Sequence, residues 1–136
     1  MPRRPPSRLP TARHTKHPVP SPPITGLPAK VIRQITKAEQ QRPHTTPGAT
    51  AQAITTLKRS LRPPAHALRH GMDCPWCDPR QALDLLHSIM QLLPSDARRQ
   101  MAAIVEPLSE RYERQTLPDP SAPADLPWWH RRILER

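Results

Sequence analysis

The sequence predicts an all-α protein, in which a small helical hairpin domain over residues 64–136 is stabilised by a zinc site. A long, disordered, Pro- and Arg-rich arm over residues 1–63 is expected to precede it. Three observations support this prediction. Apolar residues recur at helical spacing in several segments, strand-like alternation is not evident, and the 136 residues include 21 Pro but no Phe.

Charge separates the two predicted domains. Residues 1–63 contain 12 Lys and Arg against a single acid, Glu39, whereas residues 64–136 contain 9 Arg against 10 Asp and Glu. The arm is therefore expected to bind a polyanion, with nucleic acid as the first choice and an acidic protein surface as the second. The alternative is a solvated tail that keeps the protein soluble. The arm has no aromatic residue, so base stacking is not available there.

Two short basic amphipathic helices are predicted inside the arm. Residues 28–42 place Val31, Ile32, Ile35 and Ala38 at helical spacing, and residues 46–62 do the same with Ile54, Leu57 and Leu61. Helices of this length are marginal alone. We expect them either to pack on the C-terminal domain or to bind a partner.

The C-terminal domain begins with a short predicted helix that ends at Gly71 in a left-handed conformation. The next helix has Asp78 as its N-cap and Pro79 at its first position, and an apolar stripe runs along it to Leu93. These signals make residues 78–93 the best-defined element of the sequence.

A second long helix is predicted from Ser95, as its N-cap, to about residue 115, antiparallel to the first. Pro107 should kink or split it, because an interior proline costs about 3 kcal/mol. A final helical turn in residues 127–136 should close the hairpin, with Leu126, Trp129 and Ile133 facing one way.

The two cysteines of the chain lie in the segment His70-x3-Cys74-Pro-Trp-Cys77, with His66 one helical turn upstream of His70. Zinc prefers four nitrogen or sulfur ligands, and a two-residue spacer lets two cysteines bind one ion. The predicted zinc ligands are therefore His66, His70, Cys74 and Cys77. For the fourth position, His87 and His44 are the other candidates.

The order His70, Cys74, Cys77 followed by an amphipathic helix resembles the H-x3-C-x2-C motif of zinc-binding anti-sigma domains, which are small bacterial helical modules. The resemblance covers residues 66–93. It implies that the histidine and both cysteines bind zinc, and that the helical domain docks on a protein in transcription.

Other chemistry is open to the same cysteines. A C-P-W-C pair is also typical of thioredoxin-like active sites, although no strand is predicted before Cys74. The thiols could also remain unligated. A structural disulfide would need an oxidising compartment, and we expect a cytoplasmic protein because neither a targeting segment nor a membrane span is evident.

The tryptophans have two interpretations. Trp76 and one of Trp128 and Trp129 could cover the hairpin, or one of the latter pair could anchor a protein partner. The sequence thus predicts a non-enzymatic regulatory or adaptor protein that binds zinc, with a nucleic-acid-binding arm and a protein-docking helical domain. The alternative is a thiol-based redox switch or oxidoreductase that uses Cys74 and Cys77.

Overall fold

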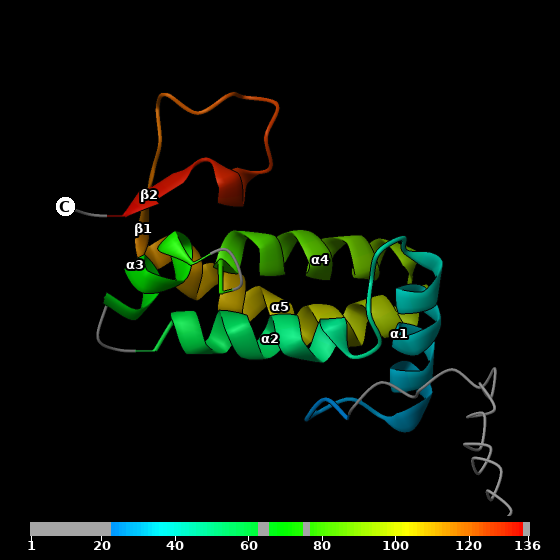
Figure 1. Cartoon of the computed structure of the whole chain (residues 1–136). Coiled ribbons are helices and arrows are strands. Elements are labelled where there is room, and N and C mark those ends of the chain that lie inside the picture. The colour runs from blue at the N-terminus through cyan, green and yellow to red at the C-terminus, as the bar shows by residue number, and fades with distance from the viewer. Residues whose placement is uncertain (1–22, 63–65, 75–76, 135–136) are drawn as a thin grey trace, which may run out of the picture.

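A computed structural model describes residues 23–62, 66–74 and 77–134. These ranges contain five α-helices and a small two-stranded sheet (Figure 1). The helices are α1 (Ala29–Gln41), α2 (Ala49–Ser60), α3 (His66–Asp73), α4 (Pro79–Leu92) and α5 (Ser95–Arg114). They are followed by strand β1 (Thr116–Pro118), a 3-10 turn (Trp128–His130) and strand β2 (Arg132–Leu134). The predicted all-α class is confirmed.

The helices α2, α4 and α5 pack against one another with their axes roughly aligned, and α1 lies across one end of them (Figure 1). At the other end, α3 packs on α2 and α4. The C-terminal segment with β1 and β2 lies at this end too, on the side of α4 (Figure 1). Cys77 is therefore next to the C-terminal end of α2.

One hydrophobic core joins all five helices, across the domain boundary that the sequence predicts after residue 63. Val31 and Ile35 of α1 and Leu57 of α2 belong to the same buried cluster as Leu86 of α4 and Met101 of α5. The reason is that α1 and α2 are too short to be stable alone and bury their apolar faces on α4. Residues 1–22 of the predicted disordered arm lie outside the described residues.

The predicted start of α4 is confirmed. Asp78 is its N-cap, and its carboxylate accepts a hydrogen bond from the Arg80 amide. Two other predicted helix ends are wrong. Gly71 lies inside α3 without a positive φ, and Ser95 is the first helical residue of α5, because Pro94 occupies the N-cap position.

Helix α5 continues through Pro107 and is not split there. Pro107 is exposed, so the carbonyl group that its ring leaves without a donor faces the solvent side of the helix. Although α5 has 20 residues, it is amphipathic. In the ranges that the structure covers, no helix combines the length and the apolar character needed to cross a membrane.

The segment after Pro127 is not the predicted α-helix. It makes one 3-10 turn and then pairs with β1 as antiparallel β2, with Leu117 opposite Ile133. Strands of three residues, one of which contains Pro118, are too short to give a recognisable alternation. Leu126 and Ile133, predicted to face the hairpin together with Trp129, are exposed.

Candidate functional site

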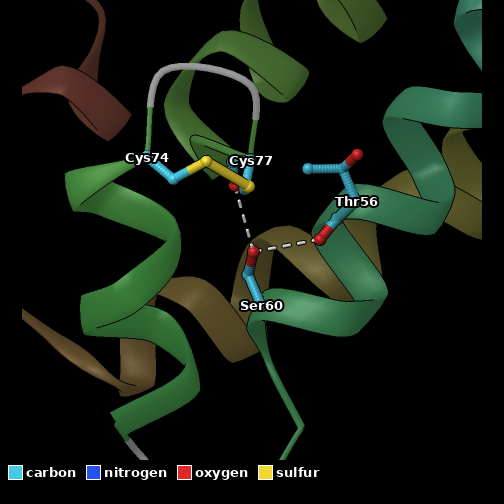
Figure 2. Close-up of a disulfide and its surroundings, with 4 residues drawn as sticks. All are labelled: Thr56, Ser60, Cys74 and Cys77. Carbon is cyan, nitrogen blue, oxygen red and sulfur yellow. Dashed lines mark hydrogen bonds between the residues drawn. A yellow bond between two sulfur atoms is a disulfide. The ribbon is translucent and has the colours of Figure 1, made fainter.

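Cys74 and Cys77 form a disulfide in the connection between α3 and α4 (Figure 2). Their Cα atoms are 5.2 Å apart, and both residues are partly exposed. The Cys77 amide donates a hydrogen bond to the Cys74 carbonyl, and the Cys74 amide donates one to the Gly71 carbonyl. A tight turn therefore holds the two sulfurs together directly before α4 begins.

The predicted zinc site is wrong. Cys74 and Cys77 are bonded to each other, so neither can serve as a thiolate ligand. His70 is exposed at the surface of α3, and the side chain of His66, the first residue of α3, lies outside the described part of the chain. Where side chains are described, no group of three or more His, Cys, Asp or Glu could hold a metal ion.

The two other histidines considered as ligands have different surroundings. His44 is exposed in the loop before α2, with a left-handed backbone (φ 59°). His87 stacks on Trp129, with ring centroids 4.4 Å apart. The C-x2-C spacing suits a disulfide as well as a metal site, and for this reason the sequence could not distinguish the two.

The cysteine turn packs directly on the last turn of α2. The Ser60 hydroxyl donates a bifurcated hydrogen bond to the carbonyl oxygens of Thr56 (3.0 Å) and Cys77 (3.4 Å) (Figure 2). Gly71 is needed at this contact, since a Cβ atom there would lie 2.8 Å from Ser60 Oγ and 3.1 Å from the Cys77 carbonyl oxygen. This close approach explains why a glycine occupies the interior of α3.

Arg80 joins the start of α4 to the end of α3. Its guanidinium forms an ion pair with Asp78 at 2.8 Å, and its Nη2 donates a 3.4 Å hydrogen bond to the Met72 carbonyl. The hydrogen bond with Asp78 raises the pKa of Arg80. The disulfide and Arg80 thus link the end of α3 to the start of α4, and Ser60 links the cysteine turn to α2.

A polar cluster that the sequence did not reveal holds the C-terminal segment on α4. The Asp84 carboxylate accepts a 2.7 Å hydrogen bond from the Trp129 indole and lies 2.8 Å from Nε2 of His130. Burial lowers the pKa of His87, although the charge of Asp84 opposes this shift. Nothing in the local pattern around Asp84 could identify it, because its partners lie more than 40 residues away.

The tryptophans of the C-terminal segment contribute to packing. Trp129 stacks on His87, and Trp128 contacts the edge of Trp129 and the ring of Tyr112. Both indoles are half-buried. The prediction that one of this pair covers the helical hairpin is confirmed for Trp129, whereas the prediction for Trp76 falls outside the described residues.

Six cations of the predicted arm, three on α1 and three at the C-terminal end of α2, are together called the basic surface, and the two groups lie toward opposite ends of the helical bundle (Figure 1). All six are exposed, and none of them pairs with a carboxylate in the part of the chain that is described. The six residues are Lys30, Arg33, Lys37, Lys58, Arg59 and Arg62.

The one acid of residues 1–63, Glu39, is only 2 % exposed. It accepts hydrogen bonds from the amides of Gly48 (3.2 Å) and Thr50 (2.8 Å) at the start of α2. The negative charge of Glu39 is therefore buried and stabilises the start of α2.

No protein-family model, curated protein or solved structure matches this chain. The resemblance to zinc-binding anti-sigma domains therefore stays a prediction from the H-x3-C-x2-C motif, without its metal.

Proposed function

We propose that this protein is a non-enzymatic nucleic-acid-binding protein that contacts phosphates through its basic surface. The observation that carries the proposal is the burial of Glu39. Because the only acid of residues 1–63 caps α2 from inside, the exposed charges of α1 and α2 are all positive. Such a surface attracts polyanions.

The arrangement of the cations on α1 supports this proposal. Lys30, Arg33 and Lys37 follow one another at spacings of three and four residues, which places them on one face of the helix. The outer two are separated by about 10 Å along the axis, at about 1.5 Å per residue. Three exposed cations in a row can neutralise neighbouring phosphates.

The chemistry of the surface suits backbone contacts rather than sequence reading. Lys and Arg bind phosphates without reading the bases, and residues 1–63 contain no aromatic side chain to stack on them. We therefore expect weak discrimination between sequences and a steep dependence on salt. Adaptor and regulatory proteins that bind nucleic acid in this way need a second surface for specificity.

Fluorescence anisotropy with a labelled 20-bp DNA duplex tests the proposal. If all six cations contact phosphates, the association constant should fall about 2,000-fold between 50 and 200 mM NaCl, from a slope of about 0.9 per contact. The double variant Lys30→Gln, Arg33→Gln should lower that slope by about 2. Its control, Arg114→Gln, removes an exposed cation at the end of α5 that is farther from α1 and should leave the slope unchanged.

Two outcomes would contradict the proposal. An equal loss of slope per removed charge in the test variant and in Arg114→Gln would mean that total charge, and not the basic surface, controls binding. Complete competition by poly-glutamate at an equal concentration of negative charge would favour an acidic protein as the partner instead.

A further inference from the structure

We propose that nucleic-acid binding by the basic surface is under redox control by Cys74 and Cys77, with the disulfide form binding more tightly than the dithiol form. This inference rests on the proposed function and adds its regulation. The structural basis is the direct packing of the cysteine turn on the last turn of α2, which carries Lys58 and Arg59.

The disulfide is accessible for exchange. Both cysteines are partly exposed, so the thiolate of a dithiol reductant of the thioredoxin class can reach a sulfur of the pair. This thiolate attacks one sulfur and forms a mixed disulfide, and the second thiolate of the reductant then releases the protein. The reductant supplies two electrons and two protons and becomes a disulfide, while Cys74 and Cys77 become thiols.

Reduction separates the two sulfurs. Two thiol sulfurs cannot remain at bonding distance, so those of Cys74 and Cys77 move apart once the covalent bond is lost, and redox control requires that the backbone of Cys77 shifts with them. The carbonyl oxygen of Cys77 is 3.4 Å from Ser60 Oγ, and Gly71 leaves no space between α3 and Ser60. A change in the turn is therefore transmitted to Ser60 on α2 by direct contact.

The C-terminal end of α2 is held from two sides. On one side, Arg111 and Gln115 of α5 donate hydrogen bonds of 3.0 and 3.2 Å to the Leu61 carbonyl. On the other side, Ser60 contacts the cysteine turn. Opening the turn removes the second support, so Lys58, Arg59 and Arg62 become less well positioned. Loss of preorganisation weakens binding, because ordering these three side chains on association then costs free energy.

The same anisotropy assay at 50 mM NaCl tests this inference on the full chain. Air-oxidised protein should bind the duplex at least about five-fold more tightly than protein kept in excess dithiothreitol, a coupling at the low end of the usual range. The variant Cys74→Ser, Cys77→Ser should bind like the reduced wild type, and dithiothreitol should not change its affinity. Circular dichroism should show the same helical content in both redox states.

A second variant tests the contact between the Ser60 hydroxyl and the Cys77 carbonyl. Ser60→Ala keeps the disulfide but removes the hydroxyl that contacts the Cys77 carbonyl, so the ratio of the two affinities should fall below about two-fold. Thr55→Ala, a matched change at an exposed position of the same helix, should keep the wild-type ratio.

The outcomes separate the two proposals. Equal, salt-dependent binding by oxidised and reduced protein would overturn redox control and leave the proposed function intact. Absence of binding by the oxidised protein would overturn both. Loss of helical content on reduction would also overturn the inference, since binding would then be lost through global unfolding and not through the contact at Ser60.

Discussion

Tyr112 shows how a single buried residue links the helices to the C-terminal segment. The residue is fully buried, and its hydroxyl donates a 2.8 Å hydrogen bond to the Trp129 carbonyl. Burial raises the pKa of Tyr112 to about 12, although the charges of Arg80 and Arg132 oppose the shift. The phenol is thus kept neutral by its surroundings.

This shift makes stability depend on alkaline pH. The pKa of the phenol is higher in the folded chain than the value of about 10 in the unfolded chain, so the folded state holds the proton more tightly. The stabilisation is complete below pH 10 and is lost as pH rises from 10 to 12, by about 2 to 3 kcal/mol in total.

Urea unfolding of wild type and Tyr112→Phe at pH 9 and pH 11 measures the effect. At pH 9 the wild type should be more stable by roughly 1 kcal/mol, the contribution of a typical hydrogen bond. At pH 11 the advantage should vanish, because each pH unit above 10 removes about 1.4 kcal/mol. An unchanged difference between the two pH values would show that Tyr112 does not ionise in this range.

At the scale of elements, the C-terminal segment is attached to the helices by polar contacts as well as by packing. Asp84 of α4 bonds Trp129 and His130, and Arg132 donates a hydrogen bond to the Thr116 carbonyl (2.7 Å). The pairing of β1 with β2 alone is too short to be stable. Asp84 is therefore the main polar contact of α4 with this segment, alongside the stacking of Trp129 on His87.

Replacing Asp84 with Ala should detach the segment without unfolding the helices. We expect faster amide hydrogen exchange in residues 128–134, little change in α1 and α2, and a loss of about 1 to 2 kcal/mol in the free energy of unfolding. Asp125→Ala, at an exposed loop position, is the control and should change neither. Equal protection of residues 128–134 in both variants would contradict the role assigned to Asp84.

At the scale of the whole molecule, one core runs from Ile24 to Tyr112. The side chains of Ile35 and Leu57 are fully buried, and each contributes about 1.5 to 3 kcal/mol through burial. For a domain of this size such contributions are a large part of the net stability. The N-terminal helices are therefore as necessary as α4 and α5.

Truncation tests this single core. A chain that begins at residue 23 should unfold cooperatively in urea, as the full chain does. A chain that begins at residue 64, the domain boundary predicted from the sequence, should lose the α1 and α2 part of the core and show no cooperative transition by circular dichroism. A folded 64–136 fragment would instead support the division into an arm and an independent domain that the sequence predicts.

The candidate site was predictable in position but not in chemistry. The motif His70-x3-Cys74-x2-Cys77 predicted a site at the correct turn, and the positive charge of residues 1–63 predicted a basic region. The disulfide, the contact of Ser60 with Cys77 and the role of Asp84 were not visible. Each depends on groups that chain folding brings together, and a two-residue spacer between cysteines suits a metal as well as a disulfide.

The sequence by itself determined the helical class, the start of α4 at Asp78 and Pro79, and the concentration of cations in the first half of the chain. These properties follow from local periodicity, capping and composition. Only the tertiary structure decided that α1 and α2 join the common core, that Glu39 turns inward to cap α2, and that residues 132–134 pair as a strand. The physical reason is the same in each case: burial and pairing depend on contacts between residues far apart in the chain, which local patterns do not record.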